Sequence, residues 1–394
     1  MSTPGRSSVE RFGPAALLTA LYVPSLWFGF LWDDSREVQR TLASAWDKVL
    51  IHPRPLYYLS FVLTNDWFSG PFPHHLVNLL LLATAVAAMS TLAWRAAVPF
   101  GPVVVLAIFL HPSFVYPITN ISQRNDLLLL SFLPLAMAYA DAPRGFVYLV
   151  LSDLAKAPFV LHNLWYAVRR WSDDRVRAIA AVLIMVALLA LILRFWAPVE
   201  TGSTSPMSGL TGSGAATAVF KLIVTGVKSL EGIALAHAPF EAHWDLWGGT
   251  AAGAALVGYL GAWGVLVRNA WRRRDALKPA YKFFAVAVLS SLPFAVVTDP
   301  RVLCPAVPFF LLGWVVAAGR QRSTGIALGV LLVLNAGGTL ANYRLSDTGA
   351  MTAAVAPDYT LCGAVEMRIP MERWRCERSA LAADIVHWVD GALR

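Results

Sequence analysis

Long apolar segments recur along this chain from near its first residue to about residue 342. Each is near the 20 residues that a helix needs to cross a bilayer's hydrocarbon core. Backbone in lipid must satisfy its own hydrogen bonds, which favours helices. We therefore predict an all-α polytopic membrane protein with about ten or eleven transmembrane helices. The clearest spans are expected near residues 14–32, 74–94, 98–118, 127–141, 176–196, 247–267, 280–298, 302–318 and 324–342.

Composition supports the same class. Of the 394 residues, 57% are hydrophobic and 14% are charged, whereas an ordinary soluble domain has about 25% charged residues. The formal net charge of +8 comes from 32 basic and 24 acidic residues. It does not indicate a nucleic-acid partner, because most cations fall in short loops between the apolar spans. The expected partners on composition are therefore membrane lipids.

The positions of these cations predict the topology, because short cytoplasmic loops are enriched in Lys and Arg. On this rule the N-terminus is cytoplasmic, and residues 33–73 and 343–394 are periplasmic. The first span ends at Trp32 without a small-residue cleavage site, so we interpret it as an anchor. We expect a multi-pass protein of the bacterial inner membrane, with its C-terminus in the periplasm. The cytoplasmic cations are Arg6, Arg11, Arg95, Arg144, Arg169, Arg170, Arg175, Arg177, Arg268, Arg272, Arg273, Arg274, Lys278, Arg320 and Arg322.

Three segments define the expected organisation. Residues 1–342 form one transmembrane domain, and residues 343–394 form a short tail. The first periplasmic loop, 33–73, is rich in aromatic residues, and its amphipathic spacing over 37–50 predicts helices lying in the headgroup layer. The stretch 145–168 has cytoplasmic arginines on both sides, so it cannot be one crossing. We predict two short helices that rise to the outer face and return, with Lys156 near the turn.

Charged residues at the edges of apolar spans are costly and are candidates for function. The pair Asp33 and Asp34 directly follows the first span, where a carboxylate could take a proton from an acceptor hydroxyl. The alternative is that Asp33 caps a helix or pairs with Arg36. Further candidates on the same face are Arg54, His74, His75, Arg124, Asp126, Asp153, Lys156 and Arg301.

Each of these cations also has a purely structural interpretation. Arg124 could pair with Asp126, and Lys156 with Asp153. Arg301 could extend to lipid headgroups. Against this, four separate loops bring a cation or an acid to the same face. The adjacent pair His74 and His75 lacks metal-ligand spacing with the acids. We therefore expect no cofactor, and a bound divalent metal is the less favoured alternative.

The three cysteines divide into two groups. Cys362 and Cys376 lie in the tail, on the side of the membrane where disulfides persist, and we predict that they pair. Cys304 stands at the start of a span, where a small packing residue is expected.

Several motifs resemble a known family. The segment FLWDDSREV is similar to the paired-Asp loop of the membrane O-mannosyltransferases that have tetratricopeptide tails, within the GT-C superfamily. RPLYYLSFVLTNDWFSGPFPHHLVNLLLLA and HPSFVYPITNISQRNDLLLLSFLPLA are similar to two further segments of that family, as are LSDLAKAPFVL and TDPRVLCPAVPFFLLG. The resemblance keeps its order over residues 28–313. It departs at Ala157 and Pro300, where that family has acids, and this chain has no tetratricopeptide array.

The resemblance implies an inverting glycosyltransferase with a GT-C-type bundle. Its donor would be a polyprenyl-phosphate sugar, used at the periplasmic face, and its acceptor a protein, lipid or glycan hydroxyl. Asp33 would be the catalytic base and Asp34 would assist. Lys156, Arg301 and Arg124 would bind the donor phosphate, and Arg54, His75 and Asp126 would position the acceptor or the loops.

Two other classes of function compete with this one. A transporter or flippase of lipid-linked sugars would have its key charges near the bilayer midplane, between repeated halves. This sequence has its charges at one face and no matching halves. A membrane scaffold would use the outer loops only to bind a partner, which would not explain paired carboxylates beside cations.

Overall fold

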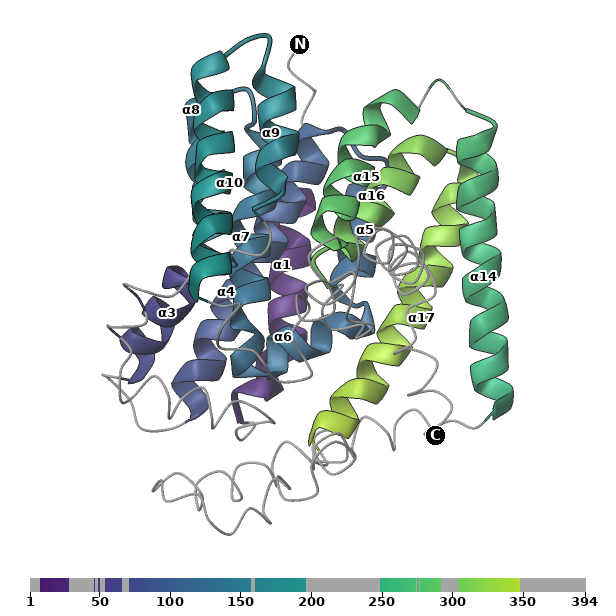
Figure 1. Ribbon diagram of the computed structural model, residues 1–394. Helices are drawn as coiled ribbons and strands as arrows, with labels where there is room; N and C mark the ends of the chain where they lie inside the picture. The colour runs from purple at the N-terminus through teal and green to yellow at the C-terminus, as the bar shows by residue number, and fades with distance from the viewer. Residues whose placement is uncertain are drawn as a thin grey trace, which may run out of the picture.

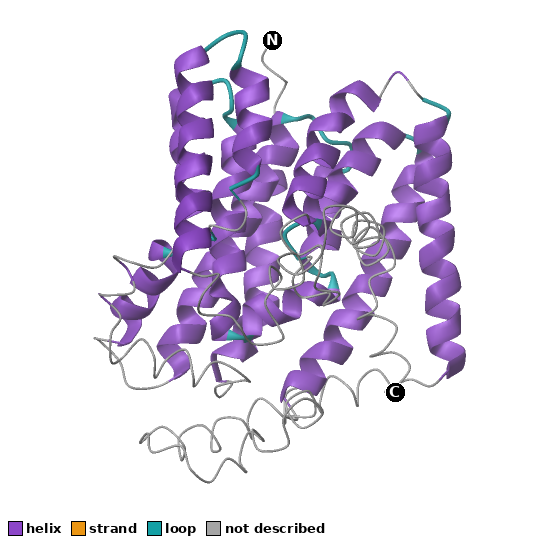
Figure 2. Ribbon diagram, viewed as in Figure 1, coloured by secondary structure: helices purple, strands orange, loops and turns teal. Residues whose placement is uncertain are grey.

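The computed structural model describes residues 8–27, 46, 49, 54–65, 71–156, 160–195, 249–273, 275, 277–291 and 304–347. Within these ranges all regular structure is helical (Figure 2). The helices form a bundle whose long axes run between two ends, with α8 and α10 on one side and α14 on the other (Figure 1). The all-α prediction is therefore confirmed for the described part of the chain.

Three helices of the first half match the spans predicted over 74–94, 127–141 and 176–196. The first helix begins six residues before the span predicted over 14–32, and the span predicted over 98–118 is broken. The first-half elements are α1 (Ser8–Tyr22), η1 (Val23–Trp27), α3 (Pro55–Asn65), α4 (Pro71–Arg95), α5 (Gly101–Phe109), η2 (Pro112–Phe114), α6 (Val115–Thr119), η3 (Ile121–Gln123), α7 (Arg124–Ala138), α8 (Pro143–Ala155), α9 (His162–Arg170) and α10 (Arg175–Phe195). Helix α3 lies inside the predicted first periplasmic loop, where it buries Tyr57 and Phe61.

The break falls in the span predicted over residues 98–118. Helix α5 ends at Phe109, and a short 3-10 turn and the five-residue α6 follow. The reason is Pro112, which has no backbone N–H and disfavours helical backbone at the preceding His111. A single continuous helix over 98–118 was therefore a wrong prediction.

The second half has four described helices: α14 (Gly249–Trp271), α15 (Leu277–Ser291), α16 (Val307–Ala318) and α17 (Arg322–Asp347). Helix α14 packs against α16 and α17, and α15 packs against α16. In the first half, α4 packs against α1 and α7, and α7 packs against α8. Helix α5 contacts both halves, because it packs against α4 and also against α16 and α17. One large hydrophobic cluster runs through α1, α4, α5, α7, α14, α16 and α17.

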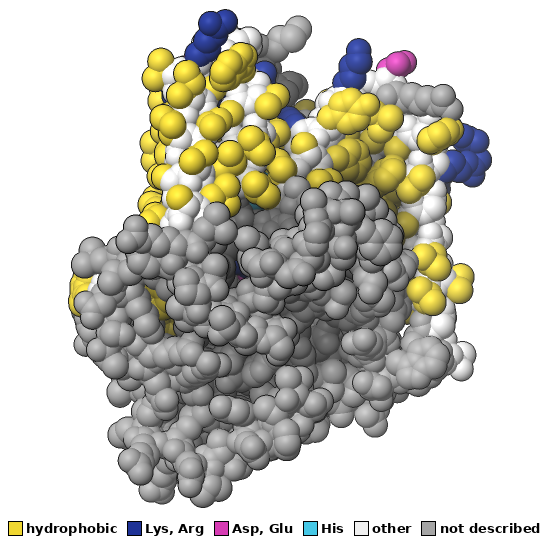
Figure 3. All heavy atoms as spheres, viewed as in Figure 1, with side chains coloured by type: hydrophobic (Ala, Val, Ile, Leu, Met, Phe, Trp, Pro, Cys, Tyr) yellow, Lys and Arg dark blue, Asp and Glu magenta, His cyan; other side chains and the backbone are white. Residues whose placement is uncertain are grey.

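Two described stretches, Pro71–Arg95 and Arg322–Leu340, are long and apolar enough to cross a membrane, judged by length and composition. Other helices leave large apolar side chains exposed. Val176 on α10 is 79% exposed and Val257 on α14 is 71% exposed. Figure 3 shows hydrophobic side chains over much of the surface of the described helices, with Lys and Arg gathered toward one end.

The predicted pair of short helices is present. Helix α8 ends at Ala155 and α9 begins at His162, so Lys156 follows the end of α8 and belongs to the turn between them. Lys156 has extended backbone angles, with φ −151° and ψ 80°, which is why the helix ends there. The turn therefore lies at the end of the bundle away from the loop that joins α7 to α8.

Candidate functional site

A buried ion pair joins the turn after α8 to the start of α7. The Lys156 ammonium donates a hydrogen bond from Nζ to Oδ1 of Asp126. Lys156 is 4% exposed and Asp126 is 1% exposed. Asp126 lies in the first turn of α7, where the helix dipole favours a negative charge. The two chain segments that carry the pair are thus fixed to each other by opposite charges that water barely reaches.

Two further groups lie within electrostatic range of this pair. Arg54, which directly precedes α3, interacts with both Asp126 and Lys156. Cys304, which precedes α16, interacts with both as well. Two cations therefore surround one carboxylate here. Cys304 has no disulfide partner and is fully buried, in agreement with the packing role that the sequence suggested.

An aromatic and aliphatic shell covers this region on one side. Tyr57 and Phe61 from α3 pack edge to face, with ring centroids 4.9 Å apart. Ile121, Leu128 and Ala155 complete this cluster from η3, α7 and α8. Such a shell excludes water and strengthens the electrostatic interactions beside it.

Arg124, two residues before Asp126, is fully buried, and protein acceptors hold its side chain in place. Its Nε donates to Oδ1 of Asn78 at 2.8 Å. Its Nη1 donates to the carbonyl and hydroxyl oxygens of Ser60 at 3.2 and 3.1 Å. Its Nη2 donates to the His74 carbonyl at 2.9 Å. Every guanidinium nitrogen thus has a protein acceptor, and α3, α4 and α7 are joined through one side chain.

Asn78 extends the network to the segment before α7. Its Nδ2 donates to the carbonyl oxygens of Ile118 and Asn120, both at 3.3 Å. The Asn120 side chain in turn accepts from the Ser122 backbone N–H at 3.2 Å. Asn78 and Ser60 were not among the predicted site residues. A lone Asn in the apolar run of α4 was the available sign, because a buried amide in such a run needs partners.

The structural pairings considered for Arg124 and Lys156 were wrong. Arg124 donates to neutral oxygens instead of pairing with Asp126. Asp126 pairs with Lys156, and Asp153 accepts from Nδ2 of Asn163 at 2.7 Å. The 30-residue separation of Asp126 and Lys156 explains the error, because only the packing of α8 on α7 makes them neighbours.

The other predicted site residues divide into two groups. His74 and His75 are both fully buried on α4, and Nδ1 of His74 lies 3.1 Å from the Thr64 hydroxyl. Among the described residues, no three His, Cys, Asp or Glu side chains gather where a metal ion could bind. Asp33, Asp34, Arg36, Arg301, Cys362 and Cys376 lie outside the described residues.

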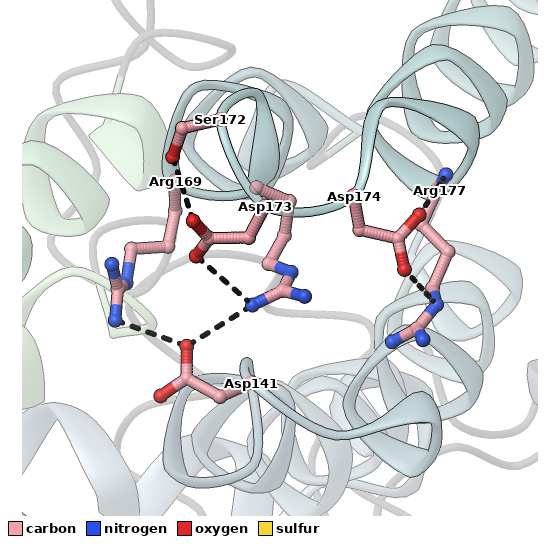
Figure 4. A network of polar contacts seen from close by, with 7 residues as sticks. Asp141, Arg169, Ser172, Asp173, Asp174 and Arg177 are labelled. Carbon is pink, nitrogen blue, oxygen red and sulfur yellow. Dashed lines mark hydrogen bonds and ion pairs between the residues drawn. The ribbon is translucent and has the colours of Figure 1, made fainter.

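A second polar network lies at the opposite ends of α7 and α8 (Figure 4). Asp141, in the loop that joins them, accepts from Arg169 at 3.0 Å and faces Arg170 at 3.4 Å. Arg170 also faces Asp173 at 3.5 Å, and Arg177 pairs with Asp174 at 2.8 Å. The side chains of Asp141 and Arg169 are 69% and 52% exposed. This network belongs to the end of the bundle where cations were predicted to mark the cytoplasm.

No protein-family model, no curated protein and no solved structure matches this chain.

Proposed function

We propose that this chain is a polytopic membrane protein that transfers a sugar from a polyprenyl-phosphate donor to a hydroxyl acceptor at the periplasmic face. The membrane part rests on the two long apolar helices and on the exposed apolar faces of α10 and α14. Apolar surface of that extent needs lipid or protein to cover it. The topology rests on the cations at the end of the bundle that carries Asp141.

The observation that supports the catalytic part is the buried ion pair of Lys156 and Asp126, with Arg54 in electrostatic contact with both. Two cations lie beside one carboxylate here, next to an apolar cluster. Cations in such a setting are the kind of side chain that binds a phosphate monoester or diester. The resemblance to polyprenyl-phosphate-dependent transferases implies the same role for Lys156.

In the proposed reaction, the acceptor hydroxyl gives its proton to Asp33 while its oxygen attacks the anomeric carbon. The bond between the anomeric carbon and the phosphate oxygen breaks, and the polyprenyl phosphate leaves with inversion. Lys156, Arg54 and Arg301 would stabilise the charge that grows on that phosphate. Asp34 would orient the acceptor. None of these steps requires a metal.

For Arg124 we favour a positioning role over direct contact with phosphate. Its nitrogens already have acceptors on α3 and α4, so phosphate binding would require those hydrogen bonds to break. By joining these helices to α7, Arg124 sets the position of Asp126 and thereby of Lys156. The same reasoning assigns Asp126, which already pairs with Lys156, to positioning.

The test separates base catalysis from donor binding in the purified full chain. Asp33→Asn should keep donor binding but lose about 100-fold or more in transfer, because it removes a general base. Arg301→Ala should weaken donor binding as well as slow transfer. Arg169→Ala, an exposed cation in the second network, is the matched control and should leave both unchanged.

The assay needs a polyprenyl-phosphate sugar matched to the host, found by mass spectrometry of envelope lipids, glycans and proteins from a deletion strain. Normal transfer by Asp33→Asn together with loss in Asp34→Asn would exchange the two roles. Normal transfer by both variants would refute the transferase mechanism.

A further inference from the structure

A small cavity lies where α14, α16 and α17 meet the end of α5, away from the proposed donor site. Ala107 and His111 line it from the α5 side, Tyr259 and Trp263 from α14, Val307, Phe310 and Leu311 from α16, and Leu331 and Asn335 from α17. About 10 Å³ is open to the centre of a water-sized sphere, which is roughly the space of one water molecule.

Three residues that line this cavity have a buried polar side-chain atom without a hydrogen-bond partner among the described residues. The atoms are Nε2 of His111, Oδ1 of Asn335 and Nε1 of Trp263. His111 is 4% exposed and Asn335 is 3% exposed. A buried polar atom without a partner costs about 1 to 3 kcal/mol, so three of them on one cavity indicate a shared partner.

The hydrogen-bond role of His111 follows from its other ring nitrogen. The Ser113 backbone N–H donates to Nδ1 of His111 at 3.3 Å, and the Ser113 hydroxyl lies 2.7 Å from the same atom. A nitrogen that accepts from a backbone N–H carries no proton. The neutral imidazole therefore has its proton on Nε2, and His111 offers the cavity a donor.

The role of Asn335 is fixed in the same way. Its Nδ2 donates to the Ala107 carbonyl oxygen at 2.8 Å, so the amide cannot be turned without losing that bond. Its Oδ1 is the remaining atom and offers the cavity an acceptor. His111 and Asn335 thus offer the cavity one fixed donor and one fixed acceptor, on segments 224 positions apart in the sequence. The Trp263 indole N–H is a further donor on the same cavity.

We propose that this cavity binds a single hydroxyl oxygen, which accepts from His111 Nε2 and donates to Asn335 Oδ1. Water and an alcohol group of a lipid share this chemistry. A carboxylate or phosphate has no proton for Asn335, and an ammonium cannot accept from His111. The apolar walls, including Phe310 and Leu331, also exclude a charged ligand. The bound oxygen fastens α17 to the segment that follows α5.

The direct test is a density map of the wild-type chain, at a resolution that shows ordered water, in detergent and again in nanodiscs of native lipid. We expect a feature about 2.7 to 3.2 Å from both atoms. An isolated feature in both maps identifies water, and density that continues into a longer molecule in lipid alone identifies a lipid alcohol. An empty cavity in both maps overturns the proposal.

Thermal melting gives a second readout. His111→Asn retains an acceptor near the Nδ1 position and removes Nε2, and Asn335→Leu removes Oδ1. Each should lower the melting temperature, and the double variant should lower it by less than the sum, because either change already removes the bridge. Ser323→Ala, on α17 but away from the cavity, is the control that should add to either. Fully additive losses for His111 and Asn335 would overturn the bridge.

Discussion

The opposite ends of α7 and α8 carry polar networks of different kinds. At one end, Asp141 and Arg169 are largely exposed, whereas the second arginine that faces Asp141, Arg170, is mostly buried (Figure 4). At the other, Asp126 and Lys156 are almost completely buried and lie beside the equally buried Arg124. The same two helices therefore join one network that water solvates and one that the protein must satisfy by itself.

The difference shows how burial changes what an ion pair contributes to stability. Exposed ion pairs contribute about 0 to 1 kcal/mol, because water competes for both partners. A buried pair gains little net stability over an apolar pair of the same volume, but leaving one partner alone is costly. A buried pair is thus weak evidence for stability, which is consistent with the donor-binding role proposed above for Lys156.

The largest expected effect comes from breaking the buried pair. Lys156→Met leaves the Asp126 charge without its partner and should reduce the free energy of unfolding by about 3 to 5 kcal/mol. The double variant Lys156→Met with Asp126→Leu should recover most of that loss, because no charge stays buried alone. Denaturant titration of the purified protein in detergent measures both. A double variant less stable than Lys156→Met would contradict this account of the pair.

A somewhat smaller loss is expected at Arg124. Arg124→Met keeps much of the side-chain volume but deprives Asn78, Ser60 and His74 of a donor. With each unsatisfied buried acceptor costing about 1 to 3 kcal/mol and part of that recovered by relaxation, we expect a total near 2 to 3 kcal/mol. Arg95→Met is the matched control, because Arg95 is more exposed and its Nε donates to one carbonyl, that of Ala138. Equal losses in the two variants would show that the buried hydrogen bonds of Arg124 contribute no more to the free energy of unfolding than the exposed one of Arg95.

Much of the fold could be predicted from the sequence, because apolar runs in this chain are long and their ends are marked by charge. Two short helices within residues 145–168 were predicted because cations on both sides rule out a single crossing, and α8 and α9 are present there. Their rise to the outer face stays a prediction. The break after α5 was missed, although Pro112 marks it. The prediction there followed hydropathy alone. A proline restricts the backbone of the preceding residue in any sequence, so Pro112 should have divided the predicted span.

The site was less accessible to sequence reasoning. The sequence pattern identified Arg124, Asp126 and Lys156 as candidates. The pairs it suggested joined residues close in sequence, such as Arg124 with Asp126. The actual partners of Arg124 are Asn78, Ser60 and the His74 carbonyl, and no periodicity predicts a contact that depends on how α3 and α4 pack. The assignments of Asp33, Asp34 and Arg301, and the disulfide between Cys362 and Cys376, stay predictions.

The smallest effect is expected at the exposed network and completes the comparison. Asp141→Asn removes the acceptor shared by Arg169 and Arg170 and should cost less than about 1 kcal/mol. The cost should shrink further at high salt, because exposed charges are screened over about 3 Å at 1 M ionic strength. Melting curves at low and high salt measure this, with Lys156→Met run beside it as the variant whose loss should persist, since buried charges are screened much less. A salt-independent loss at Asp141 as large as that at Lys156 would mean that burial does not distinguish the two networks. The loop between α7 and α8 should keep its conformation in Asp141→Asn, because other residues hold it. Gly145 leaves no room for a side chain there, since a Cβ atom would lie 2.2 Å from the Tyr139 carbonyl oxygen. Arg95 and Arg144 also lie 4.4 and 3.7 Å from the centre of the Tyr139 ring.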